Sequence, residues 1–125
     1  MILGVVLVTY TVTGDPAFAD AELRHAASRY ARIAFPAGLP EVWRVQAGVA
    51  RARGEVKDAV TLLTDAAHLA AEHGSTDTLA DIERDLSAAL DARGDEAGAR
   101  AARERAVALY QKIGALAAAR RLSQR

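Results

Sequence analysis

The sequence contains no cysteine, so disulfide bonds, thiolate metal ligands and a cysteine nucleophile are all excluded. It also has no excess of either charge, because 16 Lys and Arg residues balance 16 Asp and Glu residues. Binding to nucleic acid or to an anionic membrane relies on clustered surplus Lys and Arg. We therefore expect neither nucleic acid nor a membrane among the partners.

Aromatic residues make up only 5% of the chain, whereas alanine accounts for about a quarter of it. Alanine is the best helix former and is depleted in strands. The 125 residues amount to one small domain, long enough to bury a core without covalent staples. Composition thus predicts an all-α fold.

The N-terminal residues superficially resemble a secretory leader. Met1–Val8 is apolar and Ala17-Phe18-Ala19 has the small-residue spacing of a cleavage site. No Lys or Arg precedes the apolar run, however, and Asp15 and Pro16 lie where cleavage needs an open, uncharged stretch. The run is also too short to cross a bilayer as a helix. We expect a cytoplasmic protein.

A glycine followed by an acidic residue recurs every forty residues. The three pairs are Gly14-Asp15, Gly54-Glu55 and Gly94-Asp95. Alanines repeat with them, at positions 19, 59 and 99 and again at 26, 66 and 106. A fixed period of this length is typical of stacked helical repeats.

Each glycine separates two helical stretches, which makes each repeat a helical hairpin. The helices expected before the glycines are Ile2–Val12, Pro40–Arg53 and Leu79–Arg93, and those after them are Pro16–Ala34, Val56–His73 and Glu96–Ile113. Glycine ends a helix in a left-handed conformation at no steric cost, and the acid then caps the next helix. The connections are short, so the paired helices must be antiparallel.

We predict three αα-hairpins stacked as a short right-handed superhelix. The single helical-repeat domain spans residues 1–125, with repeats at 1–38, 39–78 and 79–114 and a C-terminal capping helix at 115–123. No single repeat can bury its apolar face alone, so stacking supplies the core.

The residues around the glycines resemble those of the tetratricopeptide repeat family. In the second repeat they are Trp43, Ala47, Gly54, Ala59, Leu63 and Ala66, and in the third Leu86, Ser87, Leu90, Gly94, Ala99 and Ala106. The third repeat departs from the pattern at Glu83, in the Trp43 column, and at Arg103, in the Leu63 column. The forty-residue period and the Ala/Arg-rich composition resemble repeats attached to regulators of high-GC bacteria.

The resemblance implies that the first helices of successive repeats line a peptide-binding groove. The charged groove residues would be Glu41, Arg44, Arg51, Asp81, Arg84, Asp85 and Asp91. Arg44 and Arg84 share a column and could hold a carboxylate between two guanidinium groups. The interpretation we favour is that Arg44 instead pairs with Asp81 or Asp85 across the repeat junction.

The first predicted helix is apolar on every side, which is unusual for the end of a helical stack. Its apolar partner surface would consist of Ile2, Val5, Val6, Val8 and Tyr10. A second copy of the chain or an upstream repeat is the expected cover. The β-branched residues of this segment leave a strand as the alternative.

No arrangement of residues predicts catalysis, a metal site or a cofactor. His68 and His73 are five residues apart, whereas two histidines on one helix face are three or four apart. Interleaved acids and arginines are typical of a solvated helix surface. We expect a non-catalytic scaffold or regulatory module for protein–protein interaction. The alternative is a small-molecule-responsive sensor module of a bacterial transcriptional regulator, for which a closed apolar pocket would be required.

Overall fold

The computed structural model describes residue 25, residues 38–73 and residues 75–124. The chain divides into two units, Met1–Pro36 and Ala37–Arg125, and five helices are described in the second. They are α3 (Leu39–Ala52), α4 (Val56–His73), α5 (Thr76–Arg93), α6 (Glu96–Lys112) and α7 (Leu116–Ser123). Within these described residues there is no strand, so an all-α fold is confirmed for this part.

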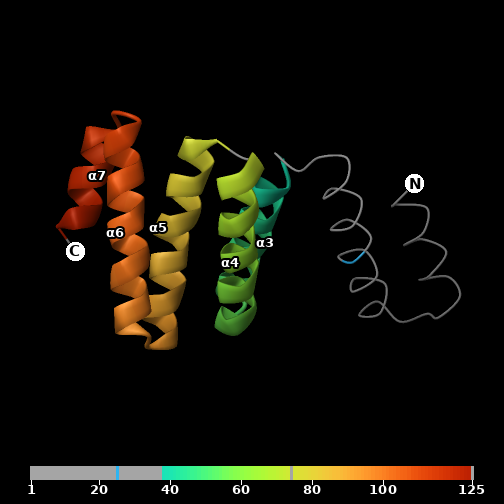
Figure 1. Ribbon diagram of the computed structural model, residues 1–125. Helices are drawn as coiled ribbons and strands as arrows, with labels where there is room; N and C mark the ends of the chain where they lie inside the picture. The colour runs from blue at the N-terminus through green and yellow to red at the C-terminus, as the bar shows by residue number, and fades with distance from the viewer. Residues whose placement is uncertain (1–24, 26–37, 74, 125) are drawn as a thin grey trace, which may run out of the picture. The chain divides into compact units, whose positions relative to one another are not determined.

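The helices pack against their neighbours in the chain and run alternately up and down (Figure 1). Each of α3 to α6 packs against the helix that follows it, and α3 also contacts α5. The second and third predicted repeats thus contain the packed helix pairs α3–α4 and α5–α6, although the predicted border between residues 78 and 79 falls inside α5. The two helices predicted before residue 38, including the alternative of a strand at 2–12, lie outside the described residues, and the single domain over 1–125 stays a prediction.

The same turn joins the helices at three places. Gly54, Gly94 and Gly114 have φ angles of 79°, 90° and 78°, in the left-handed region that glycine adopts without strain. In each turn the residue after the glycine donates its N–H to the carbonyl four residues before that glycine, with N···O distances of 2.8 to 2.9 Å. This bond satisfies a carbonyl that the helix end leaves free. The predicted role of Gly54 and Gly94 as helix terminators is confirmed.

Side-chain caps decide where two helices begin. Asp95 accepts a hydrogen bond from the N–H of Gly98 at 2.9 Å, which confirms the predicted cap of α6. Ser75 caps α5 by accepting from the N–H of Thr78 at 3.1 Å. The expected start of α5 at Leu79 is wrong by three residues, because the expectation leaves out the capping capacity of Ser75. The other described helix bounds differ from expectation by at most one residue.

Alanine columns form the close contacts between helices. Ala59, Ala66, Ala99 and Ala106 have no exposed surface, as the repeat predicts. Larger apolar side chains flank them, including Leu63 and Ile82, which are 1% and 0% exposed. Small residues allow the helix axes to approach, and the larger ones fill the remaining volume.

Glu83 occupies the column of Trp43 and is buried like it. Its side chain is 8% exposed, and its carboxylate accepts a hydrogen bond from Arg105 Nε of α6 at 3.0 Å. A buried carboxylate is costly unless it is paired and hydrogen-bonded. The pair thus joins α5 to α6 where an aromatic side chain stands in the preceding repeat.

Alanine substitutions at two glycines should change stability in opposite directions. Gly94→Ala places a Cβ in a left-handed conformation and should lower the free energy of unfolding by about 1–2 kcal/mol. Gly48 lies inside α3, and apart from the adjoining residues of its own helix no atom lies within 4 Å of the position that a Cβ would take there. Gly48→Ala should raise the free energy of unfolding by about 0.5–1 kcal/mol. Urea unfolding followed by circular dichroism measures both, and equal shifts of the same sign would contradict the assignment of the Gly94 turn.

Candidate functional site

Charged side chains of α3 and α5 form one connected group. Arg44 Nη1 donates to Glu41 Oε1 at 2.6 Å, within α3. Arg44 Nε lies 3.0 Å from Asp85 Oδ2 of α5, an ion pair without a hydrogen bond at Nε. The favoured interpretation of Arg44, pairing across the repeat junction, is therefore confirmed. This ion pair connects two helices that are separated in the sequence by α4.

Arg84 joins the same group from the next repeat. Its Nε and Nη2 atoms each donate to Asp85 Oδ1 at 3.3 Å, and its Nη1 lies 3.5 Å from Asp81 Oδ1. Asp85 thus lies between Arg44 and Arg84 and contacts both. We call Glu41, Arg44, Asp81, Arg84 and Asp85 the charged row.

Burial and neighbouring charges act in opposite directions on Arg44. Its side chain is 23% exposed, and loss of hydration alone would lower its pKa. Asp85 and Glu41 more than offset this, so the pKa is raised above its ordinary value. Arg44 therefore remains a fixed positive charge at the α3–α5 junction.

Tyr110 of α6 extends the charged row and was not among the predicted site residues. Its hydroxyl donates to Asp81 Oδ1 at 2.6 Å, and the residue is 4% exposed. Burial, together with this hydrogen bond, raises the pKa of Tyr110 to about 12. The sequence does contain a signal for this site residue, because tyrosine occurs at the equivalent positions 30 and 110 of the repeat. A recurring tyrosine is expected to be buried, and a buried tyrosine usually needs a hydrogen-bond partner for its hydroxyl.

Two of the predicted groove residues do not join the charged row. Arg51 is exposed and makes no ion pair within the described part of the chain. Asp91 contacts Arg103 of α6, with 3.6 Å between Oδ2 and Nη2. The predicted groove therefore divides into a connected portion and separate residues near the other end of α3 and α5.

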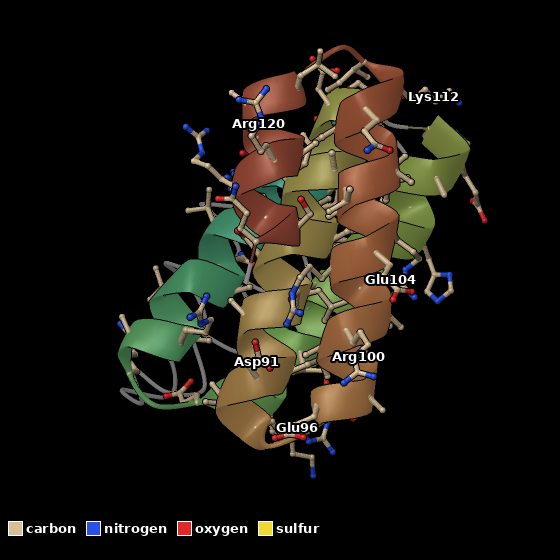
Figure 2. The ribbon with its side chains drawn as sticks, turned by 90° about the vertical axis from the view of Figure 1, so that its left-hand side faces the viewer. Asp91, Glu96, Arg100, Glu104, Lys112 and Arg120 are labelled. Carbon is tan, nitrogen blue, oxygen red and sulfur yellow. The ribbon has the colours of Figure 1, made fainter. Side chains whose placement is uncertain are left out.

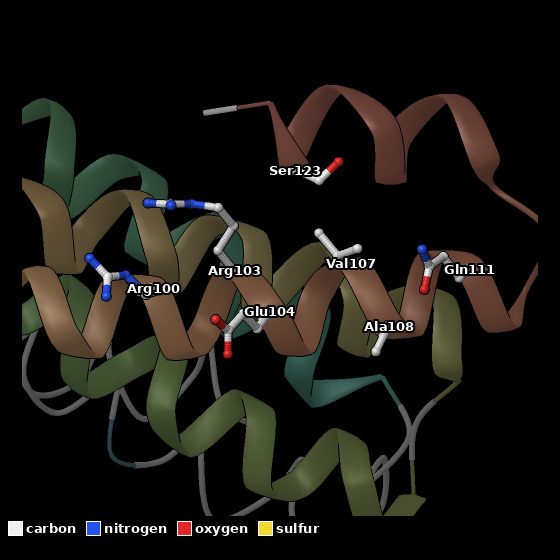
Figure 3. A pocket seen from close by; sticks show the side chains of 7 residues that line it. All are labelled: Arg100, Arg103, Glu104, Val107, Ala108, Gln111 and Ser123. Carbon is white, nitrogen blue, oxygen red and sulfur yellow. The ribbon is translucent and has the colours of Figure 1, made fainter.

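Two recesses adjoin α6 and α7. The first has a volume of about 290 Å³ and lies next to the charged row; its lining is Arg84, Tyr110, Ala118, Arg121 and Leu122. Figure 2 shows the molecule from the side of α7 and labels Arg100 and Glu104 of α6, which line the second recess. The second recess is about 350 Å³ and is lined by Arg100, Arg103, Glu104, Val107, Ala108, Gln111 and Ser123 (Figure 3).

The apolar partner surface predicted at Ile2, Val5, Val6, Val8 and Tyr10 lies outside the described residues. His25 and His73 are exposed, as expected of helix-surface histidines, and His68 is exposed in the same way. Over residues 25, 38–73 and 75–124, no group of three or more potential metal ligands comes together. Among the helices described, none has both the length and the apolar character required to span a bilayer.

Comparison with protein-family models, curated proteins and solved structures found no match for this chain. The tetratricopeptide resemblance therefore stays a prediction that rests on the repeat columns of this sequence. Support for a function comes from the charged row and the recesses themselves.

The Tyr110–Asp81 hydrogen bond predicts a loss of stability at high pH. The ordinary tyrosine pKa of 10.0 rises to about 12 in the folded chain, so the unfolded state loses its proton first. The contribution of Tyr110 is complete below pH 10 and should disappear as the pH rises toward 12. Subtracting the ultraviolet absorbance titration of Tyr110→Phe from that of the wild type isolates the phenol of Tyr110 from those of the other two tyrosines. A midpoint near 10 would contradict the hydrogen-bonded geometry.

Proposed function

We propose that the chain is a non-catalytic protein–protein interaction module, a scaffold or regulatory element that binds a peptide segment of its partner. In this proposal its hairpins belong to a tetratricopeptide-like stack that forms a short right-handed superhelix. We further propose a cytoplasmic location in a bacterium. The helix pairs α3–α4 and α5–α6, with the same glycine turn in each, support the repeat assignment.

The observation that carries this proposal is the charged row. Its side chains come from two successive first helices, and hydrogen bonds or ion pairs hold each of them in position. Arg84 and Asp81 remain 40% and 36% exposed, so a partner can reach them. Prearranged charges of both signs favour a partner with complementary charges and select against others.

The recess beside the charged row offers a place for a side chain of that peptide. Arg84 and Arg121 bring positive charge to it, whereas Ala118 and Leu122 supply apolar surface. Arg121 makes no ion pair within the described residues. Such a combination suits an acidic side chain whose methylene groups contact the apolar surface.

The alternative function, a sensor that binds a small molecule, has less support. Ligand pockets are typically enclosed and mostly apolar, with few polar groups. Both recesses contain two arginines, and five of the seven residues that line the larger one are exposed. These features suit a surface contact better than an enclosed ligand.

The proposal can be tested by affinity capture from a lysate of the organism that produces the chain. Wild-type protein should retain a partner, and Arg84→Ala should reduce its recovery by roughly tenfold, because a charge-assisted contact is lost. Arg44→Ala should weaken retention as well. Mass spectrometry quantifies the retained proteins.

Arg53→Ala is the matched control, since Arg53 is an exposed arginine at the α3–α4 turn, away from the charged row. Thermal unfolding of each variant establishes that it folds. Equal recovery of the same proteins with wild type, Arg84→Ala and Arg44→Ala would rule out the charged row as the binding surface.

A further inference from the structure

The zero net charge of the chain conceals an uneven distribution along it. Residues 55–95 contain ten Asp and Glu but three Lys and Arg, whereas residues 96–125 contain two acids and seven bases. Equivalent positions of the repeat even reverse sign: Asp65 and Glu72 of α4 correspond to Arg105 and Lys112 of α6. The positive excess is thus concentrated on α6 and α7.

Most of this positive charge has no acidic partner among the described residues. Arg105 is paired with Glu83, and Arg103 forms an ion pair with Asp91. Four other bases make no ion pair within the described part of the chain: Arg100, Lys112, Arg120 and Arg121. Figure 2 shows the face formed by α6 and α7, with Arg100, Lys112 and Arg120 labelled on it. These side chains remain available to an anionic partner.

Arg103 is the most unusual of the basic residues on α6. It stands in the column of Leu63, which is 1% exposed, and its own side chain is 22% exposed. Its Nε is buried without a hydrogen-bond partner, and its Nη2 approaches Asp91 only to 3.6 Å, beyond hydrogen-bond length. A buried donor left without an acceptor costs free energy. The Nη groups of Arg103 form no hydrogen bond within the described residues, so their donors are free for a ligand at a position where the preceding repeat places leucine.

The larger recess lies beside Arg103. Its volume is about 350 Å³, and it is lined by six residues of α6 and by Ser123, the last residue of α7. Figure 3 shows Ser123 on one side of the recess, with Arg100 and Arg103 extending from α6.

We propose that the α6–α7 recess is a docking site for an acidic segment of a partner protein, with a carboxylate seated between Arg100 and Arg103. A guanidinium group presents a planar pair of donors that matches a carboxylate. Val107 and Ala108 provide an apolar wall for the methylene groups of a glutamate. This surface is separate from the charged row and does not depend on what the charged row binds.

The surroundings favour an acidic peptide over nucleic acid as the occupant. Tyr110 is the one aromatic residue of α6 and α7, and it is only 4% exposed. No base could therefore stack on an aromatic side chain there, whereas stacking is a main contributor to single-strand binding. Glu104 also lies in the recess and would repel a continuous phosphate backbone more than a single carboxylate.

Fluorescence anisotropy with short fluorescein-labelled peptides of alternating Glu and Leu tests the proposal on the full chain. Arg103→Leu restores the residue of the Leu63 column, so it should fold at least as stably as the wild type. It should nevertheless weaken binding by about tenfold or more, as should Arg100→Ala. Arg53→Ala should change the affinity less than about twofold, because surface charges distant from a site act weakly through salt.

Each other outcome has a defined meaning. Equal binding of a matched peptide with Gln in place of Glu, or unchanged affinity of Arg103→Leu, overturns the proposal. Equal affinity for a single-stranded oligonucleotide assigns the surface to polyanions in general and also overturns it. If Arg84→Ala is the only variant that weakens peptide binding, the peptide occupies the recess beside the charged row. That result supports the proposed function and overturns this inference. If Arg103→Leu does not fold, the Nε–H resonance of Arg103 in the wild type must shift when the peptide is added.

Discussion

The fold depends on close contact between helices at alanine columns. Where Ala59, Ala66, Ala99 and Ala106 lie, a side chain of one carbon separates neighbouring helices, and none of these residues is exposed. The distance between neighbouring helices also determines which of their surface side chains can contact each other. Arg44 of α3 and Asp85 of α5 can meet at 3.0 Å because their helices are held close to one another. The charged row thus depends on the packing of α3 against α5.

The elements that local chemistry decides could be predicted from the sequence. Gly54 and Gly94 take the left-handed conformation that ends a helix, and Asp95 caps α6 as its position after the glycine indicates. The predicted start of α5 is wrong because Gly74 is followed by Ser75 and not by an acidic residue. The recurring pair of a glycine and an acid therefore does not indicate a helix cap at this position. Comparison of the repeats predicts the structure of residues that recur, but it does not predict a feature that is present in only one copy.

The predicted surface was only partly assembled by the fold, for reasons that sequence spacing does not contain. Pairing of Arg44 with Asp85 follows from adjacency of successive first helices, which the repeat implies. The contact of Tyr110 with Asp81 joins residues 29 positions apart on different helices, and its existence depends on the rotation of α6 about its own axis. Asp91 likewise contacts Arg103 of α6 rather than a residue of α3. Side-chain direction across a junction is set by the packing of whole helices, which the spacing of residues does not specify.

The three equivalent turns also bear on how such a chain can change its length. The residue after Gly54 and the residue after Gly94 each donate to the carbonyl four positions before the glycine, so two sites forty residues apart share one backbone geometry. An in-frame duplication of residues 55–94 would join Gly94 to Glu55 and would regenerate this turn at the new border. Gene duplication could therefore lengthen the array by whole hairpins while leaving each existing turn unaltered.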